Sequence, residues 1–319
     1  MLDNKDKTTE GITWVSPQSL IQLRQQAIQF SLNKSKIHAK QGGAYLSSFK
    51  GRGMEFDESR IYQAGDDIRN MDWRVTARTG TAYTKVFREE RERPVLFWLD
   101  LSDTMMFATR NKFKAVIATE IAALIAWSAA SNNDRVGGLV FSADEHIELK
   151  PRRGKSAVLD FIGRTTKHPA WANMPPESSR NMASAVSRLR KVTHPGSLIF
   201  MISDFRDMDE KAYSHLANTA RNNDIILIKI TDPIEVDLPS SGSYKFTDGK
   251  NECQVQTSNR QTRENYHRRY LDSDLQLEKF CRQNRIHIIH ISTEENAVDK
   301  LMSGLGIRSG HKVQFRSAR

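Results

Sequence analysis

The sequence predicts an α/β protein built on a doubly wound, mostly parallel sheet with one antiparallel edge strand. Short apolar segments suited to buried strands alternate with amphipathic segments of helical length from Arg93 onward, which is typical of a parallel sheet covered on both faces. Two of these apolar segments, 135–143 and 146–151, are separated by too few residues for a crossover helix. They therefore predict a hairpin that adds the antiparallel strand. A small β-rich region precedes this domain.

The composition fits an ordinary soluble globular protein. Of 319 residues, 38% are hydrophobic and 27% are charged, which excludes an intrinsically disordered chain. The only cysteines, Cys253 and Cys281, are too few for a disulfide framework or a four-cysteine zinc site, so we expect a reducing compartment. The N-terminus is polar, so we expect no signal peptide there. The most apolar segment, 113–131, is interrupted by Lys114 and Glu120, so we expect a buried helix, no membrane span and a cytoplasmic protein.

The first 93 residues predict two small regions. Within residues 1–40 we expect an amphipathic helix over 16–33, because Ser16 is a good N-cap and Pro17 suits the first helical position. Residues 41–93 are rich in glycine and serine and then alternate in "TAYTKVF", which predicts a largely β region with irregular loops.

Residues 94–305 predict the main domain. After the first strand at 95–100, the expected elements are a helix at 111–131, strands at 135–143 and 146–151, helices at 154–165 and 179–193, a strand at 197–205, a helix at 209–222, a strand at 224–232, a helix at 263–284, a strand at 285–292 and a helix at 294–304. Residues 238–262 predict a polar β-hairpin insertion, and 306–319 form a basic tail.

Oxygen-bearing side chains follow the first buried strand. Asp100, Ser102 and Thr104 stand at positions i, i+2 and i+4, and Asp204 lies at the end of a later strand. In doubly wound sheets the ligand crevice lies at the carboxyl ends of the strands, so these four residues share one edge. Carboxylate and hydroxyl oxygens suit hard cations. The pattern predicts a Mg²⁺ or Mn²⁺ site at Asp100, Ser102, Thr104 and Asp204.

Three other interpretations of the sequence stay open. Asp100 and Thr104 could cap the following helix. The Asp100 loop could serve a metal-dependent hydrolase or phosphoryl-transfer enzyme, although a phosphatase of the haloacid-dehalogenase type needs a second Asp where Ser102 stands. The formal charge of +10 could serve nucleic-acid binding, which we consider unlikely because the excess charge is spread along the chain.

A long motif lies just upstream of the first strand, between Glu55 and Glu92. Its core consists of Arg60, Tyr62, Gly65, Asp66, Asp67, Arg69, Asp72, Trp73, Ala77, Arg78, Lys85 and Glu90. This motif resembles the signature of the domain-of-unknown-function-fifty-eight family, which is von Willebrand factor A-like. The run "DLSDT" at 100–104 is similar to the Asp-x-Ser-x-Ser pattern of the metal-ion-dependent adhesion site in such domains, with Thr104 in place of the last serine.

The resemblance implies a von Willebrand factor A-like fold and a non-enzymatic protein-binding or adaptor function. In such sites the metal's open coordination position accepts a carboxylate from a partner protein. Members of the family often accompany MoxR-type AAA+ ATPases in the assembly or maturation of client proteins. Asp204 matches the family's later acid, but the expected threonine ligand falls at Arg180, with Ser179 as a substitute, so we expect a degenerate site if the arginine holds that place.

The ionic residues of the upstream motif support two hypotheses. Arginine presents a planar fork suited to carboxylates, so the motif could be a salt-bridge network that fastens the β region to the sheet. The functional alternative is a recognition surface. Both hypotheses concern the same residues: Arg60, Tyr62, Asp66, Asp67, Arg69, Asp72, Trp73 and Arg78.

Overall fold

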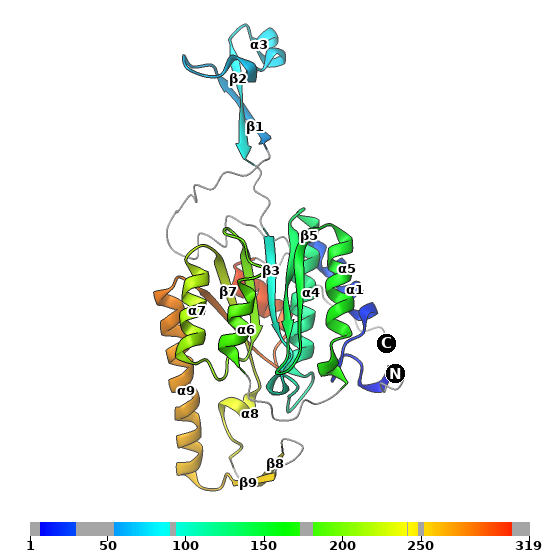
Figure 1. The fold of residues 1–319 in the computed structure, drawn as a ribbon, viewed down its shortest axis with the longest axis vertical. Coiled ribbons are helices and arrows are strands. Elements are labelled where there is room, and N and C mark those ends of the chain that lie inside the picture. The colour runs from blue at the N-terminus through cyan, green and yellow to red at the C-terminus, as the bar shows by residue number, and fades with distance from the viewer. Residues whose placement is uncertain are drawn as a thin grey trace, which may run out of the picture. The chain divides into compact units, whose positions relative to one another are not determined.

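The computed structural model describes residues 7–29, 54–89, 94–172, 181–240, 242–247 and 252–307 (Figure 1). The chain divides into two compact units. The larger unit comprises Met1–Tyr45 and Pro94–Arg319, and the smaller unit comprises Leu46–Arg93.

The larger unit contains a six-stranded sheet in the order β10-β7-β6-β3-β4-β5. Its strands are β3 (Pro94–Asp100), β4 (Arg135–Phe141), β5 (His146–Arg153), β6 (Leu198–Ser203), β7 (Asp224–Thr231) and β10 (His287–Ser292). All neighbouring pairs are parallel except β4 and β5, which pair antiparallel at one edge. The prediction of a mostly parallel α/β sheet with one antiparallel edge strand is confirmed.

Helices cover both faces of this sheet (Figure 1). One face packs against α1 (Pro17–Gln29), α4 (Lys114–Ser131), α5 (Lys155–Thr166) and α10 (Ala297–Leu305). The other face packs against α6 (Met182–Leu189), α7 (Glu210–Ala220) and α9 (Arg260–Gln283). Each face of the sheet has its own hydrophobic core, and alternate residues of β3 point into one or the other. Phe97 belongs to the core with α4, and Trp98 belongs to the core with α6 and α7. A strand buried on both faces must be apolar at successive positions, which explains its continuous apolar sequence.

Several boundaries differ from the predicted ones for local reasons. Helix α4 begins at Lys114 rather than 111, because Asn111 adopts a left-handed backbone with φ of 59°. Helix α9 begins at Arg260 because the Asn259 side chain caps it. Helix α6 ends at Leu189, before the predicted 193. The predicted Ser16 cap is present, since its Oγ accepts a hydrogen bond from Ser19 N at 3.1 Å.

Helix α4 is the most apolar helix of the described chain. By length and composition it is the one described helix that could cross a membrane, and 83% of the segment Lys114–Ser131 is buried inside the structure. The core helix of a globular domain satisfies the same criterion, and α4 packs against the sheet and contacts both α1 and α5.

Two further features lie between β7 and β10. A short helix, α8 (Pro233–Val236), directly follows β7 and was not predicted. The expected insertion contains an antiparallel hairpin, β8 (Ser243–Thr247) and β9 (Glu252–Gln256). Almost all of the predicted basic tail, from 308 to 319, lies outside the described residues.

The smaller unit is an antiparallel pair of strands, β1 (Met54–Ile61) and β2 (Tyr83–Glu89). Helix α3 (Trp73–Thr79) lies in the chain segment that connects them. The expectation of a largely β region missed this helix. It begins because Asp72 Oδ1 accepts a hydrogen bond from Val75 N, and it ends at Gly80, whose left-handed φ of 71° suits glycine.

The smaller unit has no apolar core among residues 58–85, whose side chains the structure describes. The two buried residues in this range, Asp72 and Thr84, are polar. A two-stranded hairpin is marginally stable by itself. The described part of the unit therefore depends on its polar contacts.

Candidate functional site

The predicted site residues lie where the order of the sheet reverses. The chain passes from β3 to β4 on one side and later returns to β6 on the other side of β3. Asp100 ends β3, and Ser203 and Asp204 lie at the end of β6. This is the crevice in which open α/β sheets bind ligands.

Asp100 joins the ends of these two strands. Its side chain is fully buried, and its Oδ1 accepts a hydrogen bond from Ser102 N at 2.9 Å. Its Oδ2 accepts a hydrogen bond from Ser203 Oγ at 2.6 Å, and Ser203 Oγ accepts one from Phe205 N at 3.1 Å. The carboxylate therefore holds the loop after β3 against the loop after β6.

The two predicted hydroxyl ligands lie next to each other. Ser102 Oγ is 3.5 Å from Thr104 Oγ1, and Ser102 is fully buried. Helix α4 begins only at Lys114, after Phe113 as its N-cap, and that end has no side-chain capping bond. The interpretation of Asp100 and Thr104 as caps of the following helix is therefore wrong.

Asp204 forms an ion pair inside the protein. Its Oδ2 lies 3.2 Å from Lys114 Nζ, and its Oδ1 accepts a hydrogen bond from Arg206 N at 3.1 Å. Lys114 Nζ also donates to Glu235 Oε1 at 2.6 Å, and Arg206 Nη2 lies 3.2 Å from the same oxygen. The side chains of Lys114, Asp204 and Glu235 are almost completely excluded from solvent. We call Lys114, Asp204, Glu235 and Arg206 the ion cluster.

Sequence reasoning missed Lys114 and Glu235 as members of the site. A signal was present, because a lysine within an otherwise apolar helix cannot be buried without an anionic partner. The partner could not be identified from the sequence, because Glu235 belongs to the unpredicted helix α8.

Asp232 anchors the same edge from the end of β7. Its carboxylate accepts hydrogen bonds from Thr109 N at 2.8 Å, Thr109 Oγ1 at 2.7 Å, Thr293 Oγ1 at 2.7 Å and Ile234 N at 3.1 Å. Burial raises the pKa of Asp232, but these hydrogen bonds outweigh burial and hold the pKa below its ordinary value. Glu235 completes a capping box, since its Oε2 accepts from Asp232 N at 3.0 Å.

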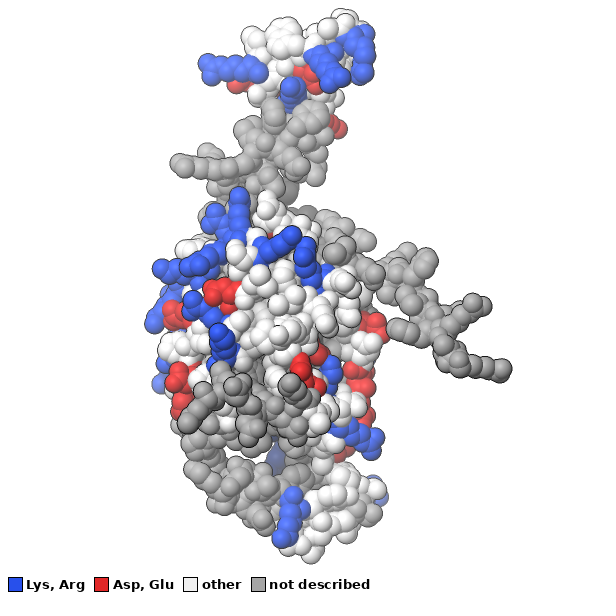
Figure 2. Space-filling model, turned by 90° about the vertical axis from the view of Figure 1, so that its right-hand side faces the viewer, with Lys and Arg blue, Asp and Glu red and all other residues white. Residues whose placement is uncertain are grey.

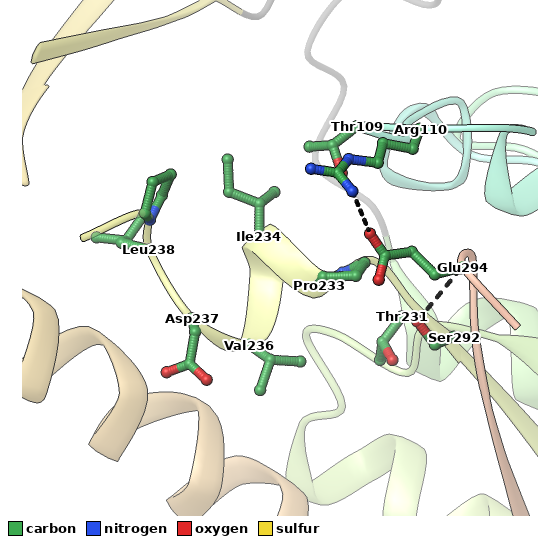
Figure 3. A pocket seen from close by; sticks show the side chains of 11 residues that line it. Thr109, Arg110, Thr231, Pro233, Ile234, Val236, Asp237, Leu238, Ser292 and Glu294 are labelled. Carbon is green, nitrogen blue, oxygen red and sulfur yellow. Dashed lines mark hydrogen bonds and ion pairs between the residues drawn. The ribbon is translucent and has the colours of Figure 1, made fainter. Parts of the chain in front are cut away.

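A solvent-open cavity of about 610 Å³ lies beside this anchor (Figure 3). Its lining includes Ile234, Val236 and Leu238 from α8 and the segment after it. Arg110 and Glu294 face each other across one side, with Nη1 and Oε1 3.5 Å apart. The cavity is a shallow, mixed apolar and charged surface at the ends of β7 and β10.

The described residues do not fit the complete predicted metal site. Asp204 already faces the ammonium of Lys114, whose positive charge opposes a divalent ion at this carboxylate. Arg180 and Ser179 lie outside the described residues. Mg²⁺ or Mn²⁺ at Asp100, Ser102, Thr104 and Asp204 stays a prediction.

Another group of potential metal ligands lies elsewhere on the sheet. Asp274 and Glu278 of α9 and His290 of β10 have ligand atoms within 4.8 Å of one another. Lys229 Nζ lies 2.7 Å from Asp274 Oδ1, and Arg282 Nη2 lies 3.3 Å from Glu278 Oε2. Both carboxylates therefore already have a cationic neighbour.

The polar residues of the upstream motif shape the smaller unit. Arg60 Nη2 lies 2.6 Å from Asp66 Oδ1, and Asp66 Oδ2 accepts a hydrogen bond from Gln63 N. The Gln63 hydrogen bond and the Arg60 guanidinium hold the pKa of Asp66 below its ordinary value. Asp67 and Asp72 accept hydrogen bonds from backbone amides at the starts of the 3₁₀-helix Ile68–Asn70 and of α3.

Other residues of the motif face solvent. Trp73, Ile68 and Ile61 are exposed by 66%, 64% and 57%. The exposed arginines of this unit are Arg69, Arg74 and Arg78, and no ion pair involves them among the described residues. In Figure 2 the Lys and Arg side chains of the smaller unit, drawn at the top, border a white surface. We call Trp73, Ile68, Ile61 and these three arginines the exposed motif surface.

The chain matches one family model and is similar in sequence to uncharacterized proteins. A family model described as "Protein of unknown function DUF58" matches residues 58–276. Uncharacterized proteins of Mycobacterium bovis and Mycobacterium tuberculosis are each 29% identical over 220 residues, which is 68% of this chain and 67% of the relative.

Two solved structures are similar to parts of the chain. An aerotolerance-related membrane protein from Bacteroides fragilis has 14% identity and a TM-score of 0.44, and the match covers 67% of this chain and 98% of that chain. The conserved hypothetical protein BatB from Bacteroides thetaiotaomicron has 13% identity and a TM-score of 0.42, with coverage of 66% and 95%.

Proposed function

The chain belongs to the family described as protein of unknown function DUF58, and from this premise we propose that it is a non-enzymatic, protein-binding adaptor. The proposed fold type is von Willebrand factor A-like. Its proposed partners are a MoxR-type AAA+ ATPase and a client protein whose assembly or maturation the ATPase assists. The proposed compartment is the cytoplasm, in keeping with the low cysteine content.

The exposed motif surface is the observation that carries this proposal. Large exposed apolar side chains are candidate contacts for a partner protein, and tryptophan and arginine are among the residues most enriched in binding hot spots. Trp73 is 66% exposed on a unit that has no apolar core in its described part. A partner that covers Trp73 would supply the apolar contacts that the unit lacks.

The charge of this surface indicates the chemistry of the partner. Arg69, Arg74 and Arg78 of the same unit are exposed, and Figure 2 shows Lys and Arg side chains of this unit around a white surface. Arginine forks bind carboxylates in a bidentate manner. The proposed partner face therefore combines an apolar groove for Trp73 with glutamate or aspartate side chains around it.

Binding of the purified, full-length chain to a purified MoxR-type AAA+ ATPase from the same organism tests the proposal. Trp73→Ala should raise the dissociation constant by about 30-fold, which corresponds to a loss of about 2 kcal/mol of binding free energy for a hot-spot residue. Leu275→Ala is the matched control, because Leu275 is 58% exposed but lies on α9 of the larger unit. Absence of binding, or equal weakening by both substitutions, would contradict the proposal.

The two alternative functions make different demands. A metal-dependent hydrolase at the Asp100 loop requires a divalent ion bound at that loop. Nucleic-acid binding through the basic charge requires an affinity that falls steeply with salt concentration. The adaptor proposal requires neither the metal nor that salt dependence.

A further inference from the structure

Lys114 stands in a place that disfavours a cation. It is the first residue of α4 and its side chain is fully buried. The N-terminus of a helix carries a partial positive charge, and burying an ammonium removes its hydration. A lysine is tolerated here because Asp204 and Glu235 lie 3.2 and 2.6 Å from Nζ.

The charges of the ion cluster cancel without any added ion. The carboxylates of Asp204 and Glu235 face the ammonium of Lys114 and the guanidinium of Arg206. A divalent metal bound to Asp204 would bring two further positive charges next to a buried ammonium. At such short distances in a buried site, that repulsion is large.

The geometry points to Lys114 as the resident cation of this edge. We propose that its ammonium takes the charge-neutralising role that the sequence predicts for Mg²⁺ or Mn²⁺, so that the carboxyl edge is assembled without a divalent metal. The inference goes beyond the proposed function, which concerns the exposed motif surface, and its test needs no partner. Failure of either proposal therefore leaves the other unaffected.

Removing the ammonium should convert the cluster into a metal site. In Lys114→Met the side chain keeps its length, and the two carboxylates that faced Nζ can accept a hard cation. The hydroxyls of Ser102 and Thr104, 3.5 Å apart, follow the strand next to β6. Lys112→Met is the matched control, because Lys112 pairs with Glu120 at 2.6 Å and remains 42% exposed.

Mn²⁺ titration followed by electron paramagnetic resonance tests this inference on the full-length chain. Wild type should show no Mn²⁺ binding that depends on Asp204. Lys114→Met should bind a Mn²⁺ ion at least about 10-fold more tightly than wild type or Lys112→Met, a gain of about 1.4 kcal/mol. The double variant Lys114→Met, Asp204→Asn should lose this gain. Binding at Asp274, Glu278 and His290 is recognised by its loss in Glu278→Gln.

Two results would overturn the inference. Wild type could bind Mn²⁺ in a manner that Asp204→Asn abolishes, which would make the edge a working metal site. A folded Lys114→Met protein could fail to gain affinity, which would make Lys114 an ordinary structural ion pair. If Lys114→Met does not fold, the comparison of wild type with Asp204→Asn decides. Mn²⁺ binding by wild type that is lost in Asp204→Asn rejects the inference. Absence of Asp204-dependent Mn²⁺ binding in wild type supports it.

Discussion

Ser203 Oγ lies 2.6 Å from Asp100 Oδ2, and both side chains are fully buried. Because Asp100 ends β3 and Ser203 ends β6, this hydrogen bond joins two strands on either side of the crevice. The predicted metal-binding loop is thus tied to its neighbour by protein contacts.

Ser203→Ala should destabilise the larger unit. The substitution removes one of the hydrogen bonds that the buried carboxylate of Asp100 accepts, which costs about 1–3 kcal/mol. Urea unfolding measures the change in the free energy of unfolding. Ser214→Ala, at an exposed position of α7, should change it by less than about 0.5 kcal/mol. Equal effects of the two substitutions would argue against the structural role of this bond.

Lys114→Met should cost more, because it leaves two buried carboxylates without their shared ammonium. Breaking a buried ion pair by removing one partner costs about 3–5 kcal/mol. Lys112→Met removes a partly exposed pair and should cost less than about 1 kcal/mol. Chemical unfolding in metal-free buffer measures both values. A cost below that of the control would mean that the ion cluster adds nothing to the fold.

The close approach of β4 to β3 requires a glycine at 138. Gly138 has a φ of 148°, and a Cβ built on it would lie 2.1 Å from Phe97 O. Gly138→Ala should therefore prevent the parallel pairing and yield little folded protein. Gly163→Ala, within α5 where a Cβ meets nothing within 4 Å, should instead stabilise by about 0.5–1 kcal/mol. Thermal unfolding compares them, and a well-folded Gly138→Ala protein would contradict the described register.

Asp232 should make the stability sensitive to acid. Burial raises the pKa of Asp232, but hydrogen bonds from Thr109, Thr293 and Ile234 lower it by a larger amount. The pKa in the folded protein therefore lies below the ordinary value of 3.8. A carboxyl whose pKa is lowered by folding stabilises the protein above its unfolded pKa, and this stability is lost as pH falls through the folded pKa.

The free energy of unfolding should therefore fall between about pH 5 and pH 2, and less steeply in Asp232→Asn than in wild type. The exposed Asp144→Asn variant should follow the wild-type slope. Urea unfolding at several pH values measures the slopes. Parallel slopes for wild type and Asp232→Asn would show that Asp232 contributes no pH dependence.

The sheet was predictable because its signals are local and repeated. The apolar run from Val95 to Leu99 must be buried on both faces, and the short connection between β4 and β5 permits only a hairpin. Helix α3 was missed because its signals, Asp72 as a cap and Gly80 as an end, flank only seven residues with no apolar stripe.

The candidate site was only partly predictable. Strand ends determine where Asp100 and Asp204 lie, because the carboxyl ends of parallel strands meet at one edge. The pairing of Asp204 with Lys114 and of Lys114 with Glu235 joins residues far apart in the chain. No spacing rule predicts such contacts, since they depend on how α4 and α8 pack against the sheet.

Hydrogen exchange of the full-length chain, alone and with the purified MoxR-type AAA+ ATPase, tests the adaptor account most directly. Exchange protection reports where the partner covers the backbone or suppresses local opening. The account predicts that the ATPase slows exchange over Ile68–Arg78, and that this protection is lost with Trp73→Ala but kept with Leu275→Ala. Unchanged exchange over Ile68–Arg78 at saturating ATPase would contradict it.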